Sequence, residues 1–125
     1  MQCLVLYSHY SEGTFPTFKA GTKLGELLPC QKYQGWYSTT YNNVEFFVYG
    51  GFVDENNTLI VDYNPTELEV HHGDMVEVLG LYQGWIWVKI TSKHNNQGSS
   101  VGQIGWLPNE IVQSCYTIKD FNNNQ

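Results

Sequence analysis

The stretch Trp85-Ile86-Trp87-Val88-Lys89-Ile90 decides the fold class of this 125-residue chain. Its residues alternate, so a strand would carry the three aliphatic side chains on one face and the two tryptophans and the lysine on the other. The aliphatic face would fill a core. Two outward tryptophans are costly to leave in water, since burying a large apolar side chain stabilises a protein by about 1.5–3 kcal/mol. We therefore expect both rings to be covered.

Similar short apolar stretches occur along the rest of the chain. They are rich in Val, Ile, Tyr, Phe and Trp and are bounded by Gly, Asn or Pro. Aromatic residues make up 15% of the chain and charged residues only 14%, a mixture that favours short strands and tight turns over helices. The sequence therefore predicts an all-β fold. We expect strands at residues 3–7, 23–28, 35–40, 45–49, 59–61, 75–79, 85–90 and 103–107.

An internal repeat divides the chain. Tyr33-Gln34-Gly35-Trp36 recurs as Tyr82-Gln83-Gly84-Trp85. Upstream, residues 18–21 match residues 70–73, and downstream, residues 51–53 match residues 105–107, in the same order and with similar spacing. We predict two copies of one fold at residues 1–58 and 59–113, joined with almost no linker. Residues 114–125 would form a tail that is partly disordered, with Ile118 and Phe121 able to dock its first part as an extra strand.

The second copy resembles a Src-homology-3 domain. The family pattern is a first strand ending in Ala-Leu-Tyr-Asp-Tyr, then Glu-Leu-Ser-Phe-x-x-Gly-Asp, a Trp-Trp pair, and Gly-Tyr-Ile-Pro-x-Asn-Tyr-Val. The matching stretches here are Leu59-Ile60-Val61-Asp62-Tyr63, Glu67-Leu68-Glu69-Val70-His71-His72-Gly73-Asp74, Gly84-Trp85-Ile86 and Gly105-Trp106-Leu107-Pro108-Asn109-Glu110-Ile111-Val112. The resemblance implies two tandem small β-barrels, the second clear and the first diverged, with Val5-Leu6-Tyr7 standing for the first copy's opening strand.

The family resemblance also implies a binding site. In that family a shallow aromatic groove holds extended proline-rich peptides, which arrive already ordered as polyproline II. Tyr63, Trp85 and Pro108 take groove positions, and Glu67 takes the acidic position that meets a basic ligand side chain. Trp36 of the first copy is a further candidate for ligand contact. The alternative is that Trp36 and Trp85 both pack between the two barrels.

The second copy also departs from the family pattern. Val61 and Ile111 replace groove tyrosines, and Glu110 replaces the usual Asn. The loop at residues 64–66 is short, and the polar segment 91–102 is long. About half of the expected groove is therefore missing. Such diverged barrels resemble the bacterial Src-homology-3-like class, which often binds cell-wall peptides but normally carries an export signal.

Charge and cysteine content restrict the class of partner. Six Lys plus Arg against 12 Asp plus Glu give a net charge of −6, which argues against nucleic acid and suits a basic partner. Neither an export signal nor an 18-residue apolar segment is visible, so we expect a cytoplasmic protein without membrane insertion. Cys3, Cys30 and Cys115 are widely spaced and form no C-x-x-C pair, so reduced thiols are expected.

The sequence offers no recognisable catalytic or metal site. His71 and His72 are neighbours, but no set of Cys, Asp or Glu completes four ligands around them. His9 and His94 are isolated. We expect no enzyme activity, no metal and no cofactor.

Two functions fit these observations. The first is a protein- or peptide-binding module that captures a proline-containing or basic partner on the aromatic groove of the second barrel. The alternative is a stand-alone inhibitor or immunity-type protein that blocks a basic toxin or enzyme. The sequence leaves the oligomeric state open.

Overall fold

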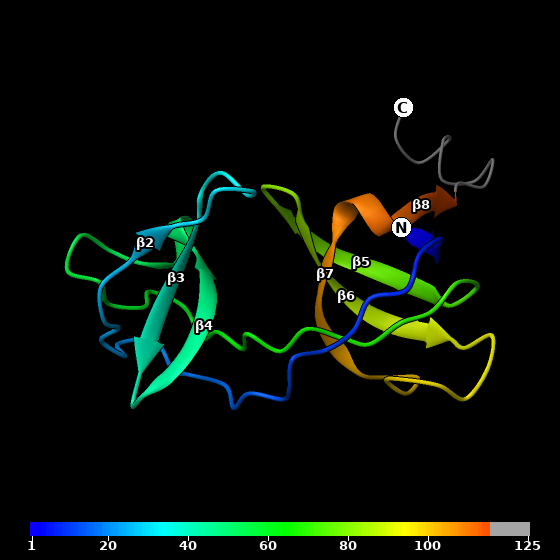
Figure 1. The fold of residues 1–125 in the computed structure, drawn as a ribbon, viewed down its shortest axis with the longest axis horizontal. Helices are drawn as coiled ribbons and strands as arrows, with labels where there is room; N and C mark the ends of the chain where they lie inside the picture. The colour runs from blue at the N-terminus through cyan, green and yellow to red at the C-terminus, as the bar shows by residue number, and fades with distance from the viewer. Residues whose placement is uncertain (116–125) are drawn as a thin grey trace. The chain divides into compact units, whose positions relative to one another are not determined.

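The computed structural model describes residues 1–115 (Figure 1). The predicted all-β class is confirmed, because the described residues form eight β-strands and two short 3-10 turns and no α-helix. The chain divides into two units. Of the described residues, 1–13 and 67–115 form unit 1 and 14–66 form unit 2. No helix in the described part of the chain is long and apolar enough to span a bilayer.

Unit 1 is built on a five-stranded antiparallel sheet of order β7-β6-β5-β1-β8. Its strands are β1 (Gln2–Val5), β5 (Met75–Tyr82), β6 (Trp85–Ser92), β7 (Ile104–Pro108) and β8 (Val112–Cys115). A 3-10 turn, η2 (Asn109–Ile111), leads into β8. The first strand in sequence therefore lies between the second and the last strands of the unit, as Figure 1 shows for the blue β1. The sheet is open: its two edge strands, β7 and β8, do not pair with each other.

Local sequence explains the long β5–β6 hairpin. Gln83 and Gly84 both have positive φ, 50° and 90°, which a two-residue turn between twisted strands requires. The register of the hairpin shifts between Val78 and Gly80, so the strand bends at this bulge.

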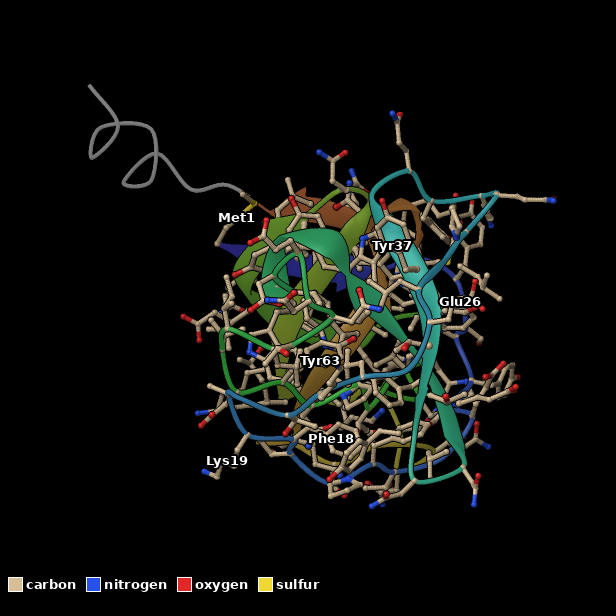
Figure 2. All side chains as sticks on the ribbon, turned by 90° about the vertical axis from the view of Figure 1, so that its left-hand side faces the viewer. Met1, Phe18, Lys19, Glu26, Tyr37 and Tyr63 are labelled. Carbon is tan, nitrogen blue, oxygen red and sulfur yellow. The ribbon has the colours of Figure 1, made fainter. Side chains whose placement is uncertain are left out.

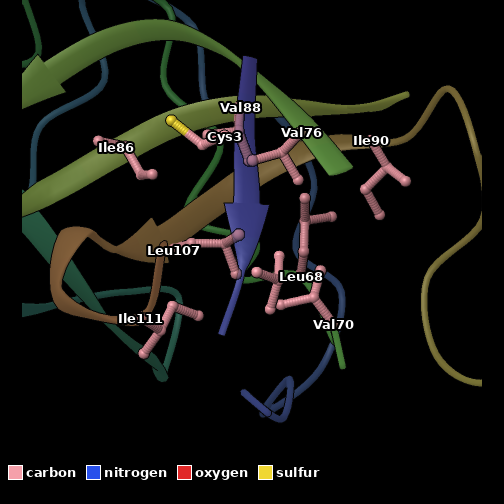
Figure 3. Close-up of a cluster of buried hydrophobic side chains, with 10 residues drawn as sticks. Cys3, Leu68, Val70, Val76, Ile86, Val88, Ile90, Leu107 and Ile111 are labelled. Carbon is pink, nitrogen blue, oxygen red and sulfur yellow. The ribbon is translucent and has the colours of Figure 1, made fainter. Parts of the chain in front are cut away.

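The core of unit 1 lies on the aliphatic face of β6, as predicted. Ile86, Val88 and Ile90 are buried, whereas the two tryptophans point to the other face and are only half-buried. Both outer rings have a ring neighbour, Trp106 for Trp87 and His9 for Trp85. Figure 3 shows the core cluster, which consists of Cys3, Val5, Leu68, Val70, Val76, Ile86, Val88, Ile90, Leu107 and Ile111.

Unit 2 contains a three-stranded antiparallel sheet of order β2-β3-β4. Its strands are β2 (Leu28–Pro29), β3 (Trp36–Tyr41) and β4 (Val44–Tyr49), followed by the 3-10 turn η1 (Gly50–Phe52). Asn42 and Asn43 both have positive φ, 50° and 65°, and close the β3–β4 hairpin in two residues. This sheet is also open.

Aromatic rings dominate the core of unit 2. Phe18 stacks on Phe46 with ring centroids 4.9 Å apart, and Tyr63 contacts both Phe46 and Phe52. Figure 2 shows Phe18 and Tyr63 on neighbouring segments of this unit, joined by an isolated antiparallel bridge. The aliphatic contribution comes mainly from Leu24, Val48 and Leu59.

In unit 1, the segment that includes β1 and extends to residue 9 lies along the chain just before β5. The Val5 amide donates to the Asp74 carbonyl (2.8 Å), and the Gly73 amide donates to the Val5 carbonyl (3.0 Å). His9 and Val70 exchange both of their backbone hydrogen bonds, each at 2.9 Å. Gly73 has φ 95°, which marks the tight turn between these two pairings.

Unit 2 repeats this arrangement with a different segment, residues 58–63. The Leu59 amide donates to the Thr22 carbonyl (2.9 Å), and the Gly21 amide donates to the Leu59 carbonyl (2.7 Å). Tyr63 and Phe18 exchange both backbone hydrogen bonds, each at 2.8 Å. Gly21 has φ 93°, so it matches Gly73 of unit 1 in conformation as well.

The 3-10 turns complete the correspondence. The Leu6 amide donates to the Ile111 carbonyl at the end of η2 (2.8 Å), and the Ile60 amide donates to the Phe52 carbonyl at the end of η1 (2.9 Å). The expected match of residues 51–53 with residues 105–107 is therefore wrong, because η1 corresponds to η2. We call residues 2–9 and 58–63 the opening segments. Each opening segment pairs within its own unit, although the residues that follow it closely in sequence belong to the other unit.

This exchange changes the division of the chain. Sequence repeats place the boundary between residues 58 and 59, whereas the structure assigns residues 1–13 to the unit that contains the second repeat. Residues 59–61, expected as the first strand of the second copy, lie in unit 2 and form only an isolated bridge, Leu59 with Val53. Residues 23–28 contribute only the bridge of Lys23 with Thr58 and the start of β2. The expected docking of Ile118 and Phe121 lies outside the described residues.

Candidate functional site

The structure places three of the five expected site residues in unit 1 and two in unit 2. Glu67, Trp85 and Pro108 belong to unit 1. Trp85 and Pro108 are direct partners across the β6–β7 pairing, so their side chains lie on one face of the sheet. Trp85 is half-buried, and Pro108 is buried.

Tyr63 does not join this group. It belongs to unit 2, is 4% exposed, and its hydroxyl donates to the Phe47 carbonyl. The ring is surrounded by the Phe46 and Phe52 rings. The expectation that Tyr63 lines a groove with Trp85 is therefore wrong, because the segment that carries it pairs within unit 2.

Trp36 is also a core residue. It is 4% exposed and packs against Tyr49 of the neighbouring strand, with ring centroids 5.7 Å apart. Trp36 and Trp85 both follow a glycine at a β-turn, yet only the Trp85 ring is accessible enough for ligand contact. The expected ligand role of Trp36 is therefore not supported, because the Trp36 side chain is buried.

The opening segment of unit 1 supplies residues that were not expected at the site. Tyr7 is 65% exposed and follows Leu6, whose amide is bonded to Ile111. Tyr7 therefore lies beside the turn that follows Pro108. Two residues further, the His9 ring meets the Trp85 ring edge to face, with centroids 6.0 Å apart.

A signal for these residues was present in the sequence. Val5-Leu6-Tyr7-Ser8-His9 matches the family's Ala-Leu-Tyr-Asp-Tyr with an aromatic ring at each tyrosine position. The stretch was assigned to the other repeat because chain order favours pairing with the nearest partner.

His9 and Glu67 form an ion pair at this surface. His9 Nε2 lies 3.1 Å from Glu67 Oε1, and the two side chains are only 16% and 18% exposed. His9 Nδ1 lies 2.9 Å from the Leu68 carbonyl oxygen. Burial acts most strongly on His9 and favours the neutral ring, but the hydrogen bonds to Glu67 and Leu68 and the charges of Glu67 and Glu12 outweigh it, so the pKa of His9 is raised.

We define the aromatic surface of unit 1 as Tyr7, His9, Glu67, Trp85 and Pro108. It combines three rings, one proline and one carboxylate from four different segments of the chain. Such a set can pack against the ridges of an extended peptide and pair with one basic side chain.

A second group of hydrogen bonds holds the opening segment in place. Ser8 Oγ lies 3.0 Å from His71 Nδ1, and His71 Nε2 lies 3.0 Å from Glu69 Oε2. The Tyr10 ring meets the His71 ring edge to face at 5.6 Å. The order of hydroxyl, imidazole and carboxylate is that of a serine hydrolase triad, but the ring nitrogens are reversed, with Nδ1 toward Ser8 and Nε2 toward Glu69. We interpret this chain of bonds as a structural tie. It fixes residues 8–10 against the turn before β5.

The long polar segment after β6 is anchored by Asp74. This carboxylate is fully buried, pairs with the Lys93 ammonium, and accepts the backbone amides of His71 and His94, each at 2.9 Å. Burial, the largest influence, would raise the pKa of Asp74. The Lys93 ammonium and the two amide donors outweigh burial and hold the pKa below its ordinary value.

The described residues also include histidines, acidic residues and two free cysteines. Within residues 1–115, no three His, Cys, Asp or Glu side chains gather as potential metal ligands. Cys3 and Cys30 are free thiols, and burial raises the pKa of Cys30. A raised pKa lowers the thiolate fraction and hence the reactivity of Cys30.

Comparison with protein families, with curated proteins and with solved structures finds no match to this chain.

Proposed function

We propose that the chain is a non-catalytic binding protein with two Src-homology-3-like units, and that the aromatic surface of unit 1 binds an extended, proline-containing peptide with a basic side chain. The observation that carries the proposal is the contact of His9 with both Trp85 and the carboxylate of Glu67, with the exposed Tyr7 two residues before His9 in the chain. His9 and Trp85 are 76 positions apart in sequence, and both side chains are partly exposed.

The fold of each unit supports the family assignment. Both units carry the same backbone hydrogen bonds between an opening segment, a glycine turn and a 3-10 turn. In unit 1 the opening segment, the glycine turn and the 3-10 turn fall in stretches that match the Src-homology-3 pattern, namely residues 5–9, residues 67–74 and the turn that follows Pro108. Five short antiparallel strands with the first strand between the second and the last are what a small barrel needs when its sheet curls.

The chemistry of the surface favours a polyproline II ligand. Such a ligand has no internal hydrogen bonds, and its proline ridges pack between flat rings at low entropic cost. The exposed Tyr7 ring and the half-buried Trp85 ring offer such flat faces.

Charge favours a basic ligand. Glu67 lies at the surface itself, Glu12 acts on His9 from the segment that follows, and the chain as a whole carries −6. These carboxylates would attract a lysine or arginine side chain of the peptide and would repel an acidic side chain.

Peptide titration tests the proposal. An array of synthetic proline-rich peptides, each with one arginine, is screened against the whole chain, and the best binder is titrated by calorimetry. We expect an affinity on the order of micromolar, typical of few contacts on a shallow surface. Tyr7→Ala and Trp85→Ala should each weaken binding about tenfold or more, since aromatic anchors commonly carry 1–2 kcal/mol or more.

Matched controls separate binding from folding. Phe47→Ala removes an exposed ring of unit 2 and should leave the affinity unchanged. Thermal unfolding of each variant shows whether it remains folded. The proposal fails if no peptide binds, or if Trp85→Ala folds normally and binds as well as the wild type. Salt-sensitive capture of one folded basic protein through a different surface would favour the inhibitor function instead.

A further inference from the structure

The carboxylate that would receive the ligand's basic side chain is already engaged. Glu67 Oε1 lies 3.1 Å from His9 Nε2, and both side chains are more than four-fifths buried. His9 therefore occupies the place that a ligand cation needs. This point rests on the proposed function and deepens it.

The hydrogen-bond partners of His9 favour the doubly protonated ring. A backbone carbonyl can only accept, so the contact of Nδ1 with the Leu68 oxygen requires a proton on Nδ1. An ionised carboxylate also only accepts, so the contact of Nε2 with Glu67 requires a proton on Nε2. Both contacts are satisfied together by an imidazolium cation. The pair His9⁺–Glu67⁻ is then neutral overall.

A ligand cation and the His9 proton compete for the same carboxylate. If a guanidinium approaches Glu67 while His9 is charged, two cations share one carboxylate in a partly buried site, where like charges repel most strongly. Loss of the His9 proton removes the repulsion and leaves Glu67 available. The ring itself can stay against Trp85, because an edge-to-face contact is also available to a neutral imidazole.

We propose that His9 is a specificity-determining residue that makes recognition of a basic peptide proton-linked. Binding of a ligand with a guanidinium beside Glu67 releases the His9 proton, so affinity for such ligands rises as the pH rises through the range in which His9 titrates. Ligands with a neutral group at this position bind without releasing a proton. The surface therefore distinguishes ligands by charge more sharply at higher pH than at lower pH.

The charged groups around His9 agree with this direction. Glu67 contacts the ring, and Glu12 acts on it from a greater distance. Both carboxylates stabilise the protonated ring in the free protein, and the pKa of His9 is raised above its ordinary value of 6.5. A ligand guanidinium neutralises one of these carboxylates and thereby lowers the pKa of His9 in the complex.

The experiment uses two peptides of identical sequence, one with arginine and one with citrulline, which is isosteric and uncharged. Calorimetric affinities are measured on the whole chain between about pH 5.5 and about pH 8.5, on both sides of the histidine range. Each titration is repeated in two buffers that differ in ionisation enthalpy, which counts the protons released. The His9→Gln variant keeps an amide that can bond the Leu68 carbonyl and lacks the titrating group.

For the arginine peptide and the wild-type protein, we expect the affinity to rise about tenfold from the lowest to the highest pH measured. At the lowest pH, close to one proton should be released for each peptide bound, as linkage to a single titrating group requires. The citrulline peptide and the His9→Gln variant should each show a flat profile without proton release. In the free protein, Glu67→Gln should lower the pKa of His9. This pKa is measured by following the NMR chemical shifts of the His9 ring protons as the pH is changed.

The outcomes separate the two proposals. If the arginine peptide binds through Trp85 but His9→Gln retains the same pH profile, or if citrulline gives the same profile as arginine, the proton linkage is refuted and the proposed function stands. If Glu67→Gln leaves the pKa of His9 unchanged, the linkage is also refuted. If neither peptide binds at any pH, the proposed function fails and the linkage fails with it.

Discussion

The exchange of opening segments makes a prediction that two substitutions can test. Val5 and Leu59 occupy equivalent positions in the two hydrogen-bond arrangements, and both are buried, at 0% and 1% exposure. In the structure Val5 belongs to unit 1 and Leu59 to unit 2. Leu59→Ala should therefore destabilise unit 2, and Val5→Ala should destabilise unit 1. A chain with domains at residues 1–58 and 59–113 would show the reverse.

The magnitudes follow from the buried groups that each substitution removes. Leucine to alanine in a closed core costs about 2–5 kcal/mol, including the cavity that is left. Valine to alanine removes two methyl-sized groups and costs about 2 kcal/mol on the same reasoning. Either loss exceeds what an exposed substitution produces, which is about 0.5 kcal/mol or less.

Hydrogen exchange measured amide by amide is the assay, because it reports the stability of each unit separately. Leu59→Ala should raise exchange on β3 and β4 by about a hundredfold, the equivalent of about 3 kcal/mol, and should change β5 and β6 much less. Val5→Ala serves as the matched control with the opposite pattern. If Leu59→Ala instead deprotects β5 and β6 while β3 and β4 stay protected, the opening segments are not exchanged and the reasoning is refuted.

Two further predictions concern the segment between β6 and β7. Asp74→Asn should destabilise the protein by about 3–5 kcal/mol, because it leaves the Lys93 ammonium without its buried partner. Since the folded pKa of Asp74 lies below its ordinary 3.8, its stabilising contribution is complete above that pH and is lost as the pH falls through the folded pKa, so acid unfolding of the variant should be less steep. An equally steep acid limb in both proteins would contradict this role. Gly98→Ala should lower the free energy of unfolding, measured by chemical denaturation, clearly more than Gly102→Ala does. Both glycines have a left-handed φ, 82° and 93°, so the backbone strain is similar in the two variants. Only at Gly98 would the new Cβ meet a backbone atom, the Glu69 carbonyl oxygen at 2.7 Å. Equal losses for the two variants would show that this close approach has no energetic effect.

The site could be predicted in part. Glu67, Trp85 and Pro108 lie in one unit because β6 pairs with β7 and Glu67 forms an isolated bridge with Trp106 of β7. Tyr63 was misplaced and Tyr7 and His9 were missed for a single reason, which is that their segments pair with partners far along the chain. The ion pair of His9 with Glu67 spans 58 positions and leaves no local pattern in the sequence.

By itself the sequence determined the features that depend on neighbouring residues. Alternation in residues 85–90 set which side chains of β6 are buried, and Gln83-Gly84 and Asn42-Asn43 set the hairpin turns, because side-chain direction and φ are local properties. Only the tertiary structure decided which opening segment pairs with which unit. Both opening segments are short and largely apolar, and they make the same pattern of backbone hydrogen bonds. Their local sequence therefore does not determine which of the two pairs with a given unit. That choice depends on long-range packing, and it determines which rings reach the surface beside Glu67.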